Sequence, residues 1–282
     1  MKKLFLPLLI VGTFTFGCKK KNDVKVDDPP KDNTECQHAY LPVLIEADNY
    51  KLDSIIYNND QTVARWYFMK MLGDWQYTYD FSYNAEGKCN VITETVLAAG
   101  RKKNIYSFTY TNNHVNVTRR NSNGEVVRSL EFTMNDKGQV ILCGSKDTVY
   151  TQSDRNVNYT ELKYNNNNIE EWIDYDYTKW ENGDENLYTT LYTMKYDDKP
   201  SLFNRLFAKN PVLQMLFMII RPTELYTFAK NNVTDITIVT EWLGHTDTTK
   251  LPINNVFDNN TGMLSARKIG IDDMYRFYIK KF

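Results

Sequence analysis

The sequence predicts an all-β fold, namely one long antiparallel meander with a short apolar helical insert near residues 201–231. The first observation is a repeat, in which a bulky residue lies four positions before the residue that ends a turn. This spacing is typical of a strand that enters a short turn and reverses. The five copies pair Tyr83 with Gly87, Tyr110 with His114, Met134 with Gly138, Tyr164 with Asn168, and Tyr196 with Pro200.

The second observation is a strict alternation of side chains between these turns. Between residues 75 and 83 every odd-numbered residue is aromatic and every even-numbered residue is polar. Because successive side chains of a strand point to opposite faces, one face is expected to be buried and the other to contact water. The turns at 84–87 and 135–138 each begin with Asn and end with Gly, which tolerates the positive φ that restarts the ladder.

The third observation is a change of period after the Tyr196-Asp197-Asp198-Lys199-Pro200 segment. Residues 202–208 and 211–220 predict two helices, and proline is favoured at the first position of a helix such as the second one. Only one residue of 212–220 is polar, so we expect a core helix that fills or covers the sheet. The alternative is a helix that binds a membrane surface or a partner. Strands are predicted again at 233–242 and at 274–280.

The N-terminus has the features of a lipoprotein signal peptide, which we assign to residues 1–17. Lys2 and Lys3 precede an apolar run at 4–14 that is too short to span a membrane. The Thr15-Phe16-Gly17-Cys18 junction resembles a bacterial lipobox, in which the cysteine is acylated and becomes the first residue of the mature chain. The alternative is ordinary signal cleavage, which leaves Cys18 as a free thiol.

The composition after residue 17 predicts two further parts. Residues 18–39 follow Cys18 with many charged residues and almost nothing to bury, so we expect a lipid anchor and flexible tether. Residues 40–282 are expected to form a single β-meander domain. Lys19 directly after Cys18 resembles lipoproteins sent to the outer membrane. We therefore expect a cell-envelope protein that is held at the membrane through acylated Cys18 and faces either the periplasm or the surface.

Charge and cysteine content restrict the classes of partner. A formal net charge of −1 gives no general attraction to nucleic acid. Cys36, Cys89 and Cys143 allow at most one disulfide within the chain, and the scattered histidines do not add a zinc-ligand spacing. We expect a monomer with no nucleic-acid partner, no metal and no other cofactor.

The hairpins resemble YD repeats, and the order of segments is similar to that of an uncharacterised Bacteroidota lipoprotein family. That order is an acylated cysteine, a meander, the 196–200 segment with Phe203, an apolar helical insert, and then Lys230-Asn231-Asn232-Val233. The resemblance covers most of residues 50–282. It implies a porin-like sheet that curls into a barrel-like or half-barrel form, and it implies no catalytic residues. A membrane-spanning barrel is not expected, because the strand faces lack an outward aliphatic band.

Chemical motifs are scarce. No nucleotide-binding, metalloprotease or serine-hydrolase motif occurs. Glu241, His245 and Asp247 lie near one turn, and we interpret them as part of a solvated loop rather than as an acid–base site. We therefore expect no catalytic residue.

One strand is a candidate ligand site. Alternation within residues 172–180 places Trp172, Asp174, Asp176 and Trp180 on one face, where indole rings can stack on sugars and carboxylates can bind hydroxyl groups. The alternative is an aromatic core face with acidic residues at its edge. A glycan bracketed by the two indoles requires both rings to face solvent.

Three functions remain open. The sequence favours a non-catalytic binding module for a glycan, a lipid or a peptide, because aromatic faces on a curled sheet provide a surface without chemistry. An envelope scaffold or interaction protein is the alternative, and a hydrolase is the third. A hollow interior with room for a ligand would favour the binding module, and converging carboxylates would favour the hydrolase.

Overall fold

The structure, a computed structural model, describes residues 40–47, 50–71, 74–97, 102–150, 154–220, 228–270 and 273–282. The expected signal peptide, Cys18, the tether and Cys36 lie outside these residues. The chain divides into two units, Met1–Cys36 and Gln37–Phe282. The second unit contains all of the described residues and has its own hydrophobic core, so it meets the criteria for a domain that folds by itself.

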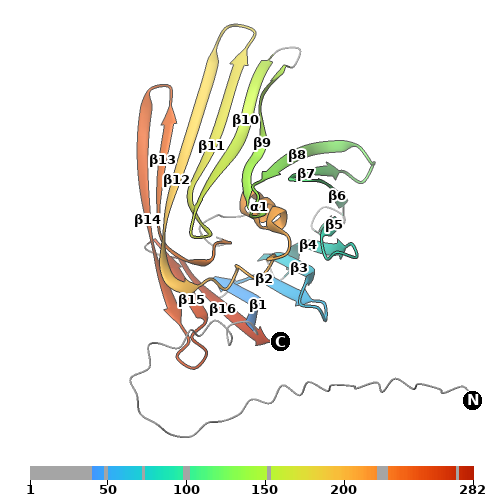
Figure 1. Ribbon diagram of the computed structural model, residues 1–282, viewed down its shortest axis with the longest axis vertical. Helices are drawn as coiled ribbons and strands as arrows, with labels where there is room; N and C mark the ends of the chain where they lie inside the picture. Colours follow the sequence, from blue (N-terminus) through green and yellow to red (C-terminus); the bar gives the residue numbers. More distant parts are fainter. Residues whose placement is uncertain are drawn as a thin grey trace, which may run out of the picture. The chain divides into compact units, whose positions relative to one another are not determined.

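The described residues form a closed barrel of sixteen antiparallel strands in chain order (Figure 1). β1 closes the ring by pairing with β16. The predicted antiparallel meander is confirmed, and the sheet is a barrel rather than a half-barrel. The strands are β1 Tyr40–Ala47, β2 Tyr50–Tyr57, β3 Val63–Met71, β4 Asp74–Tyr83, β5 Cys89–Val96, β6 Lys102–Thr111, β7 His114–Arg120, β8 Val126–Met134, β9 Val140–Tyr150, β10 Asp154–Asn165, β11 Asn168–Trp180, β12 Glu185–Pro200, β13 Asn231–Trp242, β14 His245–Phe257, β15 Leu264–Ile269 and β16 Asp273–Lys281.

The two rims of the barrel differ. One rim, which we call the plug rim, has the turns that follow β2, β4, β6, β8, β10 and β14. The chain also leaves β12 and returns to β13 at this rim. The other rim, the far rim, has the tips of the hairpins β9–β10, β11–β12 and β13–β14. These six strands are longer than the others and form an extended wall in Figure 1.

Side chains of β2–β8 alternate between the interior and the outer surface of the barrel. Trp66, Phe81 and Ile92 are buried in the interior, whereas Arg65 and Asp80 form an ion pair on the outer surface. A membrane-spanning barrel has the opposite arrangement, with an apolar band outside and a polar lumen. Strands β2–β8 therefore have an apolar core inside the ring and carry charged residues among their outward side chains.

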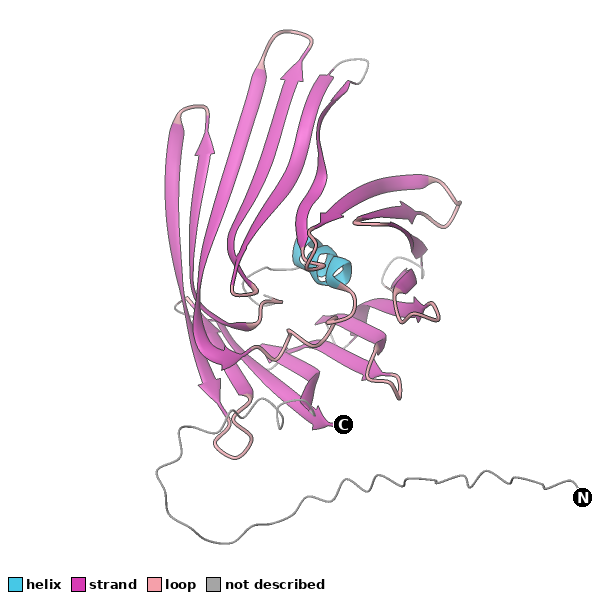
Figure 2. Cartoon of the chain, in the orientation of Figure 1, coloured by secondary structure: helices cyan, strands magenta, loops and turns pink. Residues whose placement is uncertain are grey.

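Residues 201–220 and 228–230, which belong to the segment between β12 and β13, lie in the interior near the plug rim, and we call them the plug. Its helix α1 (Pro211–Ile220) lies inside the ring of strands (Figure 2). This confirms the predicted core helix. Its buried side chains are Val212, Leu213, Met215, Leu216, Phe217 and Met218. No helix among the described residues is long and apolar enough to cross a membrane.

The helix predicted at residues 202–208 is wrong. The segment forms consecutive turns, in which Leu206 N–H donates to the Phe203 carbonyl and Asn210 N–H to the Phe207 carbonyl, each three residues earlier. Ser201 Oγ accepts the Phe203 N–H at 3.2 Å, as an N-cap side chain does, but the bonds that follow remain of the three-residue type. Residues 221–227 of the predicted insert lie outside the described part of the chain.

Aromatic rings join the plug to the barrel wall. Phe217 of α1 stacks on Trp66 of β3, with centroids 4.8 Å apart and ring planes 5° apart. Phe207 contacts both Phe217 and Phe81, at centroid distances of 5.2 and 5.7 Å. Each such pair contributes about 0.5–1.5 kcal/mol beyond its area burial. The plug is therefore part of the core and not a loop laid on its surface.

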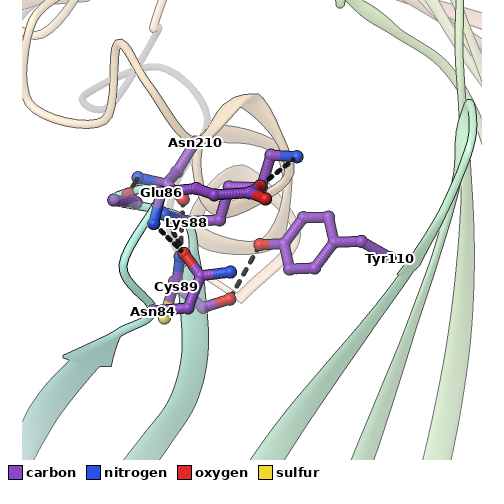
Figure 3. A network of polar contacts seen from close by, with 7 residues as sticks. Asn84, Glu86, Lys88, Cys89, Tyr110 and Asn210 are labelled. Carbon is purple, nitrogen blue, oxygen red and sulfur yellow. Dashed lines mark hydrogen bonds and ion pairs between the residues drawn. The ribbon is translucent and has the colours of Figure 1, made fainter.

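Hydrogen bonds fix the plug to the turn between β4 and β5 (Figure 3). Asn210 Oδ1 accepts the Cys89 backbone N–H at 2.7 Å, and Asn210 Nδ2 donates to the Gly87 carbonyl at 3.2 Å. Tyr110 donates its hydroxyl to the Cys89 carbonyl at 2.8 Å. Both backbone groups of Cys89 are thereby satisfied in a buried position.

Asn232 holds the other end of the plug. Its N–H donates to Asp197 Oδ1 at 3.2 Å, and its Nδ2 donates to the carbonyls of Lys199 and Pro200 at 3.1 and 3.2 Å. These contacts join the 196–200 segment to the 230–233 segment. Both segments belong to the family resemblance. Residues 196–200 lie where the chain leaves the barrel wall, and residues 230–233 lie where it returns to it.

The repeated tyrosines share one contact, which we call the tyrosine clasp. Each clasp tyrosine lies near the end of an even-numbered strand and donates its hydroxyl to a carbonyl near the start of the preceding strand. The pairs are Tyr57 with Pro42 (2.6 Å), Tyr83 with Val63 (2.8 Å), Tyr110 with Cys89 (2.8 Å), Tyr164 with Val140 (2.8 Å) and Tyr196 with Ile169 (2.6 Å). Four of the five sequence copies therefore make the same bond at the plug rim, and Tyr57, which lies outside the repeat, makes it as well.

The turns at 84–87 and 135–138 agree with their prediction, since Gly87 and Gly138 both have φ of +75°. The copies that end at His114 and Asn168 use shorter turns. Asn166 and Asn167 have φ of +50° and +67°, and asparagine accepts this region more readily than most residues.

Cys89 and Cys143 are buried free thiols, so no disulfide joins them. Burial raises the pKa of each thiol to about 12. Cys36 lies outside the described residues.

Candidate functional site in the barrel lumen

The barrel wall divides between β8 and β9. Ladder pairs join these strands only at Phe132, Thr133 and Met134 of β8, near the plug rim. Toward the far rim the described residues of the two strands are not paired with each other, and Figure 1 shows them diverging. The wall therefore has a lateral opening on this side.

Gly144 marks the point at which β9 separates from β8. Its φ is +87°, and a Cβ at this position would lie 2.7 Å from the Asn158 carbonyl oxygen and 3.2 Å from Tyr159 Cα. Glycine alone accommodates this close backbone approach at positive φ. β9 therefore follows β10 beyond this point and separates from β8.

The opening leads to a cavity of about 550 Å³ on the far-rim side of α1. Leu130 and Ile219 give it an apolar part, and Arg128, Asn158 and Thr160 give it polar groups. This volume is within the range of small-molecule sites, about 300–1,000 Å³. This cavity thus lies at the division of the wall and reaches Ile219 of α1.

Two rows of inward-facing side chains cross β10–β14 beside the cavity. Ladder register places the members of each row on neighbouring strands. The lower row, nearer α1, is Thr160, Asp174, Thr190, Thr240 and Asp247, and the upper row, nearer the far rim, is Asn158, Asp176, Tyr188, Trp242 and His245.

Asp174 is the most constrained acid of the lower row. Its Oδ1 accepts hydrogen bonds from Thr160 Oγ1 and from Trp172 Nε1, both at 2.6 Å. Burial raises the pKa of this carboxyl above its ordinary value, while the two hydrogen bonds act in the opposite direction. The side chain is therefore held in one orientation by neighbours on its own wall.

The upper row has an aromatic surface. The rings of Tyr188 and Trp242 are 8° from parallel with centroids 6.3 Å apart, and His245 lies 5.9 Å from Trp242. Tyr188 is 41% exposed, so this surface is open to solvent. Asp176 lies next to Tyr188 in register and is also exposed. Flat rings beside a carboxylate can bind a molecule that has both apolar faces and hydroxyl groups.

A second polar cluster lies on the inner wall of β5–β7. The buried Glu94 accepts hydrogen bonds from Asn104 Nδ2 at 2.7 Å and from Arg119 Nη2 at 2.8 Å. Arg128, which lines the cavity, lies directly opposite Arg119 in the ladder. Because Glu94 neutralises Arg119, the exposed Arg128 brings positive charge to the edge of the cavity.

The structure corrects the ligand face predicted from the sequence. Trp172, Asp174, Asp176 and Trp180 do share the inner face, but the two indoles are not both exposed. Trp172 is 3% exposed, because it packs against Tyr192 and donates to Asp174. Trp180 is 42% exposed at the end of β11. A glycan bracketed by both indoles is therefore excluded, and ligand binding by Asp174, Asp176 and Trp180 stays a prediction.

The residues near the β13–β14 turn do not converge. His245 and Asp247 face the lumen, whereas Glu241 pairs with Thr246 on the outer face. Among the described residues no group of three or more His, Cys, Asp and Glu side chains is placed to hold a metal ion.

Sequence reasoning missed Arg128, Tyr188 and Trp242 as members of a site. Alternation assigns Tyr188 to an aromatic face, but only the register between β12 and β13 brings Trp242 beside it. Arg128 has no signal of its own in the sequence, because its place depends on the division between β8 and β9.

Fold and site together define a plugged sixteen-strand barrel with an accessible lumen. No family model and no curated protein matches the sequence. The chain is similar to a porin-like protein from Bacteroides vulgatus ATCC 8482, with 9% identity, a TM-score of 0.38, and coverage of 84% of this chain and 98% of that chain. It is also similar to a porin-like protein from Bacteroides uniformis ATCC 8492, with 14% identity, a TM-score of 0.31, and coverage of 85% and 96%.

Proposed function

We propose that the protein is a cell-envelope lipoprotein whose barrel binds a carbohydrate in its lumen without cleaving it. The observation that carries the proposal is the upper row, where Tyr188 and Trp242 form an open aromatic surface beside Asp176 and Asn158. Adjacent strands are about 4.8 Å apart, so the five strands of this row span about 19 Å. A short oligosaccharide fits such a row.

The carboxylates favour binding over hydrolysis. Glycosidases place two carboxyl groups on opposite sides of a scissile bond, about 5–9.5 Å apart. Asp174 and Asp176 project side by side from one strand, and Asp174 is occupied by Thr160 and Trp172. The wall therefore supplies acceptors for hydroxyl groups but no opposed acid and base.

Carbohydrate binding is tested by titrating envelope and host glycans against the tryptophan fluorescence of the barrel, residues 37–282. We expect Tyr188→Ala and Trp242→Ala to weaken binding at least tenfold, since each removes half of the aromatic surface. Tyr175→Ala is the matched control, because Tyr175 lies on the same strand as Asp176 but on the outer face, where it stacks on Tyr159. Equal binding by all three variants, or no glycan bound by the unchanged barrel, would refute the proposal.

Membrane attachment rests on the Gly17-Cys18 junction and the charged tether. It is tested by metabolic labelling of the full chain with a fatty-acid analogue, followed by membrane fractionation. We expect label in the native chain and none in Cys18→Ala. Equal labelling of both chains contradicts acylation at Cys18.

One observation favours the alternative of an envelope scaffold. The outer face of β11–β13 places Ile173, Leu191 and Val239 side by side in register, and Leu187 on the same face is 40% exposed. An outward apolar group of this kind is typical of a docking surface for another protein. Leu187→Lys with Leu191→Lys would abolish co-purification of a partner under this alternative and leave glycan binding unchanged.

A further inference from the structure

A second cavity lies between the plug and the turns β8–β9 and β10–β11, and it has a volume of about 580 Å³. It shares no lining residue with the lumen cavity. The volume is in the range of sites that hold one small molecule. Its lining combines two chemically different parts, which lie at different depths.

The deep part is apolar and adaptable. Its side chains are at most 5% exposed and come from β10, β11 and the plug; they are Leu162, Ile169, Met215, Met218 and Phe228. Methionine side chains are flexible and polarizable, so they adjust to ligands of irregular shape. A hydrocarbon chain is the ligand chemistry that matches this lining.

The outer part is cationic. Lys137 of the β8–β9 turn and Lys230 at the end of the plug both line the cavity and are exposed. Among the described residues neither ammonium group forms an ion pair. Two cations at the edge of an apolar cavity attract an anionic head group.

The walls of the cavity are held by hydrogen bonds within the protein. Gln139 Nε2 donates to Asn167 Oδ1 at 3.1 Å and joins the two turns. Tyr164 donates its hydroxyl to the Val140 carbonyl at 2.8 Å, and Gln214 Nε2 donates to the Asn204 carbonyl at 3.2 Å within the plug. Little ordering is therefore required when a ligand binds, which favours affinity.

We propose that this plug-rim cavity binds a single-chain amphiphile with an anionic head group, with the acyl chain against Met215 and Met218 and the head group between Lys137 and Lys230. A fatty-acid carboxylate and a lysophospholipid phosphate share this chemistry. The site is independent of the carbohydrate proposal, because its residues and its ligand class are different.

The experiment uses the barrel, residues 37–282, and measures displacement of a fluorescent fatty-acid probe. Oleate and lysophosphatidylglycerol are the two anionic competitors, and lysophosphatidylcholine is the competitor with an additional positive charge. We expect both anionic amphiphiles to displace the probe, and we expect lysophosphatidylcholine to be at least tenfold weaker. Displacement by only one of the anionic pair identifies the head group as carboxylate or phosphate.

Two variants locate the site. Lys137→Glu with Lys230→Glu should weaken probe binding at least tenfold, because the head group then meets two anions. Ala208→Trp should do the same by occupying the cavity, since Ala208 is exposed and lines it. Lys51→Glu with Lys250→Glu is the matched control, because both lysines are exposed on strands away from the cavity, and it should bind the probe unchanged.

The proposal is overturned if the unchanged barrel does not bind the probe, or if lysophosphatidylcholine competes as well as the anionic amphiphiles. It is also overturned if the Lys137→Glu/Lys230→Glu variant binds the probe as well as the Lys51→Glu/Lys250→Glu variant does. Normal binding by Ala208→Trp overturns the location. Urea unfolding of each variant shows that a loss of binding does not come from unfolding. Tyr188→Ala should keep full amphiphile binding, so a failure of this proposal is distinguishable from a failure of the carbohydrate proposal.

Discussion

At the scale of single residues, the tyrosine clasp explains why the same spacing recurs along the chain. A tyrosine four positions before the end of a turn is placed to reach the carbonyl of the preceding strand, as Tyr83 reaches Val63. Burial raises the pKa of the clasp tyrosines, so they stay protonated donors throughout the physiological range. Met134 occupies the same position in β8 without a hydroxyl, beside the division of the wall.

Asp174 gives a prediction at this scale. Burial raises the pKa of its carboxyl above the value in the unfolded chain. Because the pKa of Asp174 is higher in the folded chain, its protonated carboxyl adds to the free energy of unfolding at low pH. This contribution is lost as the pH rises through the folded pKa. Asp174→Asn keeps an acceptor for Thr160 and Trp172 but carries no charge. We therefore expect Asp174→Asn to be more stable than the native barrel at pH 7.

Urea unfolding at pH 7 and at about pH 3 measures this effect, because the difference between the two proteins should shrink at the lower pH. Asp176→Asn is the control, since Asp176 is exposed. A native barrel that is more stable than Asp174→Asn at pH 7 would show that the carboxylate is stabilised by its surroundings.

At the scale of elements, the division between β8 and β9 depends on one glycine. Gly144 and Gly124 both have positive φ, +87° and +83°, but only Gly144 has neighbouring backbone within 4 Å of a Cβ. Gly144→Ala should be more destabilising than Gly124→Ala by about 1–3 kcal/mol, because the close approach adds to the cost of positive φ. Chemical denaturation of both variants measures the difference. Equal losses would show that the crowding at Asn158 relaxes without cost.

The plug is the second element that determines the interior of the barrel. Its helix α1 was predictable from an apolar run that had to be buried. The turns before it were not predictable, because Leu202, Phe203, Leu206 and Phe207 are all buried in the core and such packing has no local sequence signal. Asn210 and Asn232 then attach the plug to the wall through bonds to residues far away in the sequence. Such partners have no local signature.

At the scale of the whole molecule, the barrel is closed and has apolar residues inside, and the lumen cavity and the plug-rim cavity border different parts of the plug. Cys89 and Cys143 are the only cysteines of residues 37–282, and both are buried with pKa values raised to about 12. At pH 8 only about one thiol in ten thousand is then a thiolate. We expect neither thiol to react with a thiol reagent in the folded barrel.

Both thiols should become reactive together across the urea transition, because they belong to one hydrophobic core although they lie on different strands, β5 and β9. Ser129→Cys supplies the control, since Ser129 is exposed and a cysteine there should react in the folded state. Reaction of Cys143 well before Cys89 would indicate that the region around the β8–β9 division opens separately from the rest of the barrel.

The sequence by itself determined the meander, most of its turns and the burial of α1, because these depend on alternation, on glycine and asparagine at positive φ, and on an apolar run. It also determined which residues of β11 share a face. Only the tertiary structure decided that Trp172 is core and that Tyr188 meets Trp242, since burial and register depend on neighbouring strands. Closure of the ring and the division at Gly144, which borders the lumen cavity, likewise depend on contacts between residues on different strands.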